Sequence, residues 1–291
     1  MERSHRSTFV NQVPFHTRVT ILVDNNVAPG LDLKPEHGFA ALVEQDSRRW
    51  LFDTGQGPAL VHNANVLGMD LTGLTTVVLS HGHYDHTGGL LEVLKLNPTI
   101  EIIAHPGALG LHFSLRKGRS IPRDIGMPNK ERVFGLNQPR FSPVITFEQI
   151  LDQVWFTGEV PRRFTCKSDS GLLTPTNNGF RQDPIVDDAS VLLETASGPV
   201  LLLGCAHAGV RNILHYVREQ RGVTELAAVI GGTHLGLSDP SETPQAIQAF
   251  ADFNVKCLAP CHCTGEGPSS KLKAHFEGRF RHAHAGAVFE F

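Results

Sequence analysis

The sequence has no long apolar run, no strong charge of one sign and no even set of cysteines. Of its 291 residues, 41% are hydrophobic and 19% are charged, and the formal net charge is −3. No apolar run approaches the length of about 20 residues that a membrane-spanning helix needs. No basic stretch with interleaved aromatics indicates base stacking, and so small a net charge gives no pull towards nucleic acid or membrane. We therefore expect a small-molecule substrate, with no nucleic-acid or membrane partner; the oligomeric state leaves no readable mark.

Other absences narrow the class further. The five cysteines are odd in number and scattered, so they form no disulfide framework. Residues 1–10 are polar and charged and lack the apolar core of a signal peptide, so we expect a cytoplasmic protein. The chain has no Gly-x-Ser-x-Gly nucleophile elbow, no internal repeat and no linker, which favours one domain over residues 1–291.

One short run is rich in metal-binding side chains. His81-Gly82-His83-Tyr84-Asp85-His86 directly follows the apolar stretch 75–80, which predicts a buried strand. Imidazole and carboxylate together suit Zn²⁺, Fe²⁺ or Mn²⁺. Because His81 and His83 are two residues apart, extended backbone points them the same way, while Asp85 and His86 begin the next turn and can face a second ion. The run therefore predicts a site for two divalent ions.

The rest of the chain alternates between strand and helix patterns. We expect strands at 17–24, 39–44, 50–52, 77–79, 100–104, 190–194, 200–203, 226–230, 255–259 and 287–291. Helical spacing is expected near 90–94, 207–221, 241–253 and 269–276. This alternation, with hairpin-like early strands, predicts α/β layers with mixed sheets. His81, His207, His234 and His262 each follow an expected strand end, and such ends converge at one sheet edge.

Residues 107–181 differ in character from the rest. They carry Pro, Gly and weak periodicity, and eleven Lys or Arg stand against six Asp or Glu. Long irregular insertions in compact domains are often lids or binding loops. We expect an irregular, basic insertion or lid, in which Arg162 binds an anionic substrate through its planar fork. A solvated basic loop is the alternative.

These residues resemble the metallo-β-lactamase superfamily. The resemblance rests on His81-x-His83-x-Asp85-His86 after a strand, with Asp53-Thr54-Gly55 upstream, and it covers essentially the whole chain. It implies an αββα sandwich of two mixed β-sheets flanked by helices, with the site at one edge of the sheets.

Further motifs resemble one subgroup, the dihydropterin–ribofuranosylaminobenzene phosphate synthase-like proteins. They are Glu36-His37-Gly38, residues 157–162, Gly204-Cys205-Ala206-His207-Ala208-Gly209, residues 231–235 and Pro260-Cys261-His262-Cys263-Thr264-Gly265. Fold does not fix function, so the substrate does not follow from this resemblance.

The resemblance also implies a ligand set. His81 and His83 would hold one ion, and Asp85, His86 and His262 the other. The superfamily usually adds a third His and a bridging Asp. Here Cys205 stands where that Asp would be and Asp188 lies near the third-His position, so we expect His207, with Asp188 as a further candidate, to complete the set. Cys205 is a soft ligand or a core thiol, and we expect Cys261 and Cys263 to be buried thiols.

Other side chains are candidates for roles around the metals. Asp85 and His234 are the candidate catalytic residues, although His234 could be a structural turn residue. Asp53 is expected to accept a hydrogen bond from a ligand imidazole, with a turn or cap as the alternative. His37 and Asn25 are candidates for substrate binding. His105, His112, His282 and His284 are expected at the surface.

Four functions remain in competition. The first is a hydrolase of a small anionic ester, lactone or phosphoester, with two divalent ions, Zn²⁺ or else Mn²⁺ or Fe²⁺, and a metal-bound hydroxide. The second, implied by the subgroup, is a transferase that condenses a pterin and displaces pyrophosphate. An iron oxygenase is third; di-iron relatives usually carry Glu where His83 stands, which argues against it. A non-catalytic metal-binding protein is fourth.

Overall fold

Two mixed sheets and one small sheet make up the β-structure of the computed structural model, which describes residues 16–136, 139–167 and 170–291. The first sheet has the order β17 (Val288–Glu290), β1 (Thr17–Val23), β2 (Ala40–Gln45), β3 (Arg48–Phe52), β4 (Thr76–Val78), β5 (Glu101–Ala104), β8 (Arg140–Pro143). The second has the order β16 (Leu258–Cys261), β15 (Ala228–Gly232), β14 (Val200–Leu203), β13 (Ser190–Leu193), β10 (Val154–Phe156), β9 (Glu148–Leu151). The third has the order β12 (Gly179–Gln182), β11 (Leu172–Thr176), β6 (Phe113–Ser114), β7 (Arg123–Asp124).

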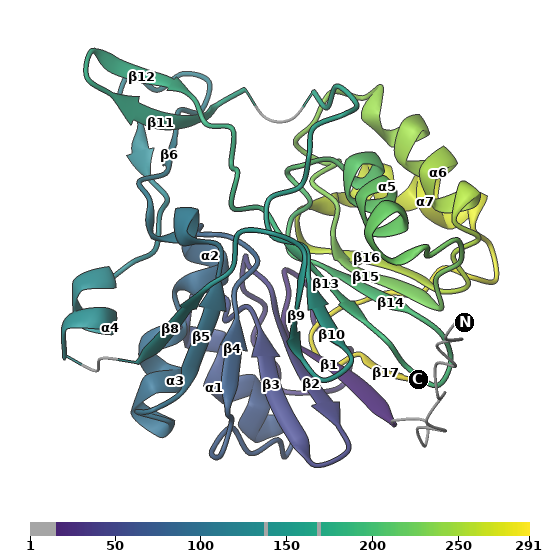
Figure 1. Cartoon of the computed structure of the whole chain (residues 1–291), viewed down its shortest axis with the longest axis horizontal. Coiled ribbons are helices and arrows are strands. Elements are labelled where there is room, and N and C mark those ends of the chain that lie inside the picture. Colours follow the sequence, from purple (N-terminus) through teal and green to yellow (C-terminus); the bar gives the residue numbers. More distant parts are fainter. Residues whose placement is uncertain (1–15, 137–138, 168–169) are drawn as a thin grey trace, which may run out of the picture.

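The two large sheets pack face to face, with helices on their outer faces (Figure 1). Apolar side chains of both sheets, such as Ile21, Phe52, Val191 and Leu202, share one buried cluster between the sheets. The first sheet is covered by α1 (Pro58–Val66), α3 (Leu90–Leu96) and α4 (Lys130–Leu136). The second is covered by α5 (Val210–Arg221), α6 (Glu242–Asp252) and α7 (Glu266–His275). The expected αββα sandwich is confirmed.

Strand direction places the candidate residues at one edge of the sandwich. In the first sheet β3, β4, β5 and β8 are parallel, and in the second β14, β15 and β16 are parallel. Parallel strands present their carboxyl ends at one edge, so the segments that follow β4, β14, β15 and β16 meet there. The short helix α2 (Tyr84–Thr87) and the 3₁₀ turns η1 (Pro106–Leu109) and η2 (His262–Thr264) lie in such segments.

Residues 107–181 are not a single irregular insertion, which corrects that expectation. Strand β8 extends the first sheet beside β5, and β9 and β10 extend the second beside β13. The third sheet is built only from residues 113–124 and 172–182 (Figure 1). These strands are two to five residues long, which is too short to leave a clear periodicity in the sequence.

The sequence analysis did not predict helix α1. Its buried residues include Asn63, whose side chain donates to the carbonyl oxygens of Leu22 and Lys34 at 2.8 and 2.9 Å. A polar residue on the inner face breaks the apolar spacing by which such a helix is recognised. The polar segment 1–10, on which the expected absence of a signal peptide rests, lies outside the described residues. Among the described helices, none has the length and apolarity to cross a membrane.

Candidate metal centre

Three histidines from two sheets form a first ligand group. His81 and His83 follow β4, and His207 follows β14 in the other sheet. One nitrogen of each ring lies within 4.8 Å of the others, and all three residues are buried. Nε2 of His81 lies 2.9 Å from Nδ1 of His83. The structure therefore brings His207 to His81 and His83, from which the sequence separates it by more than a hundred residues.

The first ligand group has the electronic state that a metal ion requires. Burial lowers the pKa of His83 to about 3 and holds the pKa values of His81 and His207 well below their usual range. These imidazoles are neutral, so each has a lone pair to offer a cation. Both ring nitrogens of His207 and Nε2 of His83 are buried without a hydrogen-bond partner. Such orphaned nitrogens are costly unless they bind something, and a divalent ion fits them.

Asp85, His86 and His262 form a second ligand group beside the first. The carboxylate Oδ2 of Asp85 lies 3.4 Å from Nε2 of His262 and 3.9 Å from Nε2 of His86, and the two Nε2 atoms lie 3.2 Å apart. Asp85 and His86 are on α2, whereas His262 begins η2 after β16. The rings of His81 and His86 are 4.2 Å apart, so the two groups are neighbours.

Asp53 fixes the orientation of an imidazole in each group. His86 donates from Nδ1 to Oδ2 of Asp53 at 2.7 Å. The Ser80 hydroxyl donates to the same oxygen at 2.7 Å and lies 2.9 Å from Nδ1 of His81. When Nδ1 is tied in this way, Nε2 of each ring is left to face the metal position. Gly204 makes room, because a Cβ there would lie 2.1 Å from the Ser80 hydroxyl oxygen.

Asn25 and His37, the candidate substrate-binding residues, lie on the second ligand group. Nδ1 of His262 donates to the Asn25 side-chain oxygen at 3.0 Å, so Asn25 orients that imidazole. Nε2 of His37 lies 3.2 Å from Oδ2 of Asp85. The His37 side chain is half exposed, and together with Asp85 and His262 it forms a further possible ligand set. Both residues therefore contact the ligand group itself.

Asp188 and Arg162 lie away from the positions expected for them. The Asp188 carboxylate accepts a hydrogen bond from the Ala208 N–H at 2.8 Å and belongs to none of the possible ligand sets among the described residues. It therefore positions the segment that carries His207. Arg162 donates to the carbonyl oxygens of Pro184 and Ile185, at 2.7 and 2.9 Å, so its guanidinium holds a loop.

Cys205 lies between the two groups. Its Sγ is 3.2 Å from Nε2 of His86, and it forms a possible ligand set with His81 and His86. Cys205 also forms one with His234 and Cys263. Burial raises the pKa of the Cys205 thiol well above its usual value. Within the described part of the chain all five cysteines are free thiols.

Four residues at this edge have left-handed backbone conformations. The φ angles are 60° at Asp53, 57° at Ala206, 56° at His234 and 50° at His262. Such angles are uncommon for residues other than glycine and cluster at functional sites, where surrounding structure holds them. Each directly follows, or lies within three residues of, a strand end, so the turns out of the strands aim these side chains.

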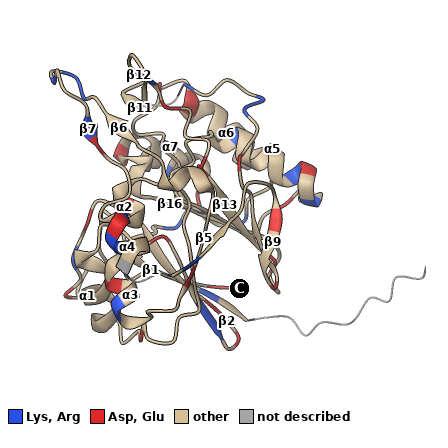
Figure 2. Ribbon diagram, turned by 60° about the vertical axis from the view of Figure 1, so that its left-hand side comes forward, with Lys and Arg blue, Asp and Glu red and all other residues tan. Residues whose placement is uncertain are grey.

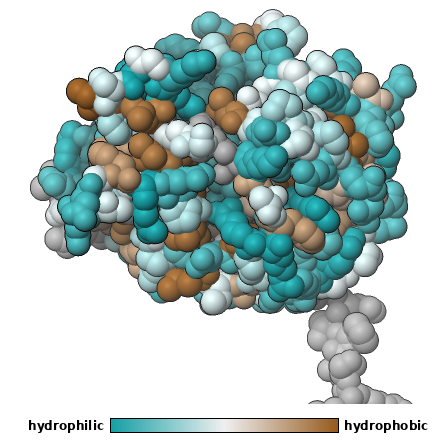
Figure 3. All heavy atoms as spheres, turned by 90° about the horizontal axis from the view of Figure 1, so that it is seen from above, coloured by the Kyte–Doolittle hydropathy of each residue, from teal (hydrophilic) through white to brown (hydrophobic). Residues whose placement is uncertain are grey.

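A cavity of about 260 Å³ opens from the ligand groups towards the third sheet. Its lining includes His83, Asp85, His207, His234 and His262. The lining also includes Arg116, Arg119 and Arg123, which we call the arginine wall. Figure 2 shows blue ribbon segments, which mark Lys and Arg, beside β7, and Figure 3 shows that this face mixes apolar and hydrophilic patches.

Histidine 112 is a residue that the sequence analysis placed wrongly. It is buried, as is His105, whereas both were expected at the surface. Nδ1 of His112 lies 2.7 Å from Oδ2 of Asp183, and its ring centre is 5.3 Å from that of His83. Despite burial, the hydrogen bond that His112 donates to Asp183 and the charge of Asp187 raise the pKa of His112. The partner is 71 residues away in sequence, so no local pattern could reveal the pair.

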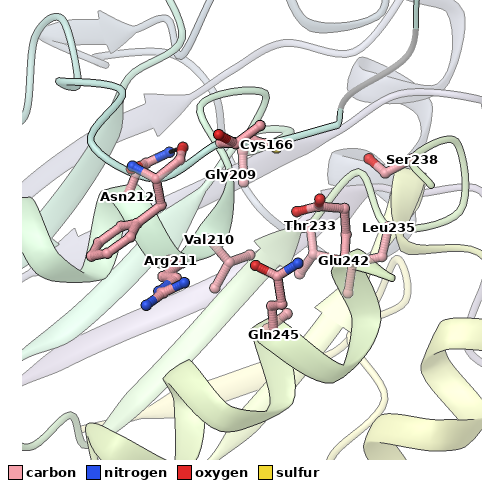
Figure 4. A pocket seen from close by; sticks show the side chains of 14 residues that line it. Cys166, Gly209, Val210, Arg211, Asn212, Thr233, Leu235, Ser238, Glu242 and Gln245 are labelled. Atoms are coloured by element: carbon pink, nitrogen blue, oxygen red, sulfur yellow. Dashed lines mark hydrogen bonds between the residues drawn. The ribbon is translucent and has the colours of Figure 1, made fainter. Parts of the chain in front are cut away.

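A second hollow lies between the starts of α5 and α6 (Figure 4). Its lining includes Cys166, Gly209, Asn212, Thr233 and Glu242. A volume of about 20 Å³ admits a water-sized molecule rather than a substrate. The cavity of about 260 Å³ is the candidate substrate site because side chains of both ligand groups line it.

The fold and the two ligand groups define a class of protein. The sequence profile described as the metallo-β-lactamase superfamily matches residues 33–161. A solved structure described as Tm1679, a metal-dependent hydrolase of the β-lactamase superfamily, shares 30% sequence identity with this chain. That match covers 94% of this chain and 99% of the other, with a TM-score of 0.81. The chain belongs to the metallo-β-lactamase superfamily.

Two archaeal proteins are similar over most of the chain. A 7,8-dihydropterin-6-methyl-4-(β-D-ribofuranosyl)-aminobenzene-5'-phosphate synthase of Methanocaldococcus jannaschii is 28% identical over 271 residues, covering 88% of this chain and 90% of its own. An uncharacterised protein of the same organism is 29% identical over 273 residues, covering 93% of this chain and 98% of its own. The expected likeness to the synthase-like subgroup is confirmed.

Proposed function

We propose that this protein is a metal-dependent hydrolase that uses two divalent ions at the adjoining ligand groups. The observation that carries the proposal is the meeting of two ligand groups, each with three side chains, at the floor of one cavity. Imidazole and carboxylate are borderline and hard ligands that suit Zn²⁺, with Mn²⁺ and Fe²⁺ as alternatives. The orphaned nitrogens of His207 and His83 support metal binding independently of family membership.

Divalent ions bound there would activate a water molecule by lowering its pKa to about 7, and they would act as a Lewis acid on a carbonyl or phosphoryl oxygen. The chain's own residues provide the rest. Asp53 holds His86 directly and His81 through Ser80, so both rings keep one tautomer. His234 lines the cavity with both ring nitrogens free of hydrogen bonds, so it can donate a proton to a leaving group. Asp85 remains ionised because the charge of His86 and hydrogen bonds from His262 and His37 outweigh its burial and hold its pKa well below the usual range.

The substrate that fits is a small anionic ester, lactone or phosphoester. The arginine wall lines the same cavity as the ligand groups, and a guanidinium binds two oxygens of a carboxylate or phosphate at once. Arg123 also lies 5.2 Å over the ring of Tyr84, which keeps that side chain close to Asp85 on α2. A substrate with a cleavable bond at the metals and an anionic group at the wall would fill both sides.

The test is a hydrolysis screen with zinc-loaded protein in heavy-oxygen water. We expect one product to carry solvent oxygen and activity to be higher on anionic esters or phosphoesters than on neutral analogues of the same size. Chelation should abolish turnover and zinc should restore it. Turnover that survives complete metal removal would contradict the proposal.

A second candidate is a pterin-condensing transferase that displaces pyrophosphate. It is favoured by the 28% identity to the methanogen synthase over 88% of this chain. The arginine wall would then hold the departing pyrophosphate rather than a substrate anion. Release of pyrophosphate that depends on an aromatic amine acceptor, without incorporation of solvent oxygen, would favour the transferase over the hydrolase.

A further inference from the structure

Beside the two ligand groups lies a set of two thiols and one imidazole that neither group uses. Cys205 follows β14, His234 follows β15 and Cys263 lies in η2 after β16. The two sulfur atoms and one ring nitrogen of His234 lie within 4.8 Å of one another, and all three residues are buried. We call these three residues the thiol group.

Two glycines of β15 explain how the thiol group forms. Strand β15 runs between β14 and β16, so an ordinary side chain at its end would separate Cys205 from Cys263. A Cβ on Gly232 would lie 2.7 Å from Sγ of Cys263 and 3.3 Å from Cα of Cys205. Gly231, at φ 124°, leaves no room for a Cβ either, since it would lie 1.9 Å from the Leu203 carbonyl oxygen. The Gly231-Gly232 pair therefore lets thiols from the two flanking strands meet across β15.

The imidazole of the thiol group has no hydrogen-bond partner in the protein, and one of its sulfur atoms accepts a backbone N–H. Both ring nitrogens of His234 are buried without a hydrogen-bond partner. Sγ of Cys263 accepts the His234 backbone N–H at 3.2 Å and lies 3.7 Å from the Cys205 carbonyl oxygen. A backbone N–H directed at sulfur stabilises a thiolate, and a buried imidazole without a partner is costly. Packing alone accounts for neither feature, whereas a bound cation accounts for both.

We propose that Cys205, His234 and Cys263 bind a third ion, a borderline or soft divalent cation such as Zn²⁺ or Cd²⁺. Two thiolates and one imidazole are ligands that Zn²⁺ prefers, and three protein ligands leave one position open. Binding releases the two thiol protons to solvent, and no oxidant or reductant is needed. The third ion would occupy one ring nitrogen of His234 and leave the other free to donate to a leaving group, so the inference goes beyond the proposed function and is compatible with it.

The chain contains a matched control for the thiol group. Cys261 is also buried and ends β16, two residues before Cys263. Among the described residues it belongs to none of the possible ligand sets. Cys261→Ser and Cys263→Ser therefore exchange the same atoms in equally buried surroundings, and only the second removes a ligand.

The experiment is a cadmium titration of the full chain after chelation, with ions counted per chain and thiolate-to-cadmium charge-transfer absorption recorded. We expect Cys263→Ser to bind one ion fewer than the wild type and to lose at least half of the charge-transfer absorption. Cys261→Ser should match the wild type in both. An unchanged ion count in folded Cys263→Ser would overturn the proposal, even with weaker absorption, because the thiols would then belong to the second ligand group.

A second variant covers the case in which Cys263→Ser does not fold. His234→Asn keeps both thiols and should also bind one ion fewer, with tighter ions at the two ligand groups retained. Circular dichroism would establish that the variant is folded. A folded His234→Asn chain with the full wild-type ion count would equally overturn the proposal.

Discussion

The sheet edge that carries the ligand groups and the third sheet that carries the arginine wall are built in opposite ways. At the edge, ligand side chains are buried and come from the ends of parallel strands, and Asp53 and Asn25 orient His86 and His262. The third sheet is formed by strands of two to five residues, and Arg123 on β7 is exposed. From this contrast we expect metal binding to depend on the two large sheets and substrate choice to depend on the third sheet at their rim.

Loss of a metal-ligating side chain should have the largest effect on this difference between the two regions. His83→Ala removes an imidazole from the first ligand group and leaves His81 and His207 unable to hold an ion tightly. We expect metal affinity to fall by more than the roughly 10–100-fold typical of residues that only support ligands, and turnover to disappear with it. Metal content and hydrolysis are measured together, with the exposed His282→Ala as control. Full turnover in metal-free His83→Ala would contradict a metal-based mechanism.

Loss of an orienting residue should have the next largest effect. Asp53→Asn keeps the size of the side chain but weakens its bond to Nδ1 of His86 and its bond with Ser80. We expect metal affinity to fall about 10–100-fold. Competition with a chromogenic chelator measures this, and excess zinc should restore turnover. Unchanged affinity would mean that Asp53 serves only the turn after β3.

Substitutions in the arginine wall should not change the metal content of the protein. Arg119→Gln removes one cation from the cavity lining, and loss of a charge-assisted hydrogen bond costs about 1.5–3 kcal/mol, or roughly 10–100-fold in KM. We expect kcat and metal content to stay near the wild-type values. Arg140→Gln, on β8 at the edge of the first sheet, is the matched control. A loss of metal from Arg119→Gln would erase the distinction between the two regions.

Replacement of Asp188 should have the smallest effect on turnover, so the quantity to measure is the free energy of unfolding of the chain. Burial raises the pKa of Asp188 to about 6 from 3.8. The folded chain therefore binds this proton more tightly than the unfolded chain, and stability falls by about 3 kcal/mol as the pH rises from below 4 to above 6. Asp188→Asn retains an acceptor for the Ala208 N–H and should lack this fall.

Urea unfolding of chelated protein at pH 4.5 and pH 7 measures the difference between wild type and variant. The variant should gain stability relative to the wild type at the higher pH. An equal difference at both pH values would show that the Asp188 carboxyl has the same pKa in the folded and unfolded chains.

The sequence allowed us to predict the metal-binding run and the positions of most strands along the chain. It did not reveal which distant side chains contact one another. His81, His83, Asp85 and His86 lie in one run after an apolar stretch, and His207 and His262 follow strands of clear pattern, so their convergence could be predicted. Arg162 was expected to bind an anion, and nothing local in the sequence shows that its guanidinium bonds two carbonyl groups instead.

Residues that act through distant partners were missed for the same reason. His112 meets Asp183, 71 residues away, and the two residues lie just outside the short strands β6 and β12. The approach of Cys263 to Cys205 depends on Gly232 in the strand between them, which is visible only once β14, β15 and β16 are aligned.

The number of divalent ions per chain tests the central claim most directly. Elemental mass spectrometry of the full chain, reconstituted with zinc and freed of excess metal, gives this number. The adjoining ligand groups predict two or more ions in the wild type and loss of ions in His83→Ala. One ion or none in the wild type would contradict a centre built from both groups.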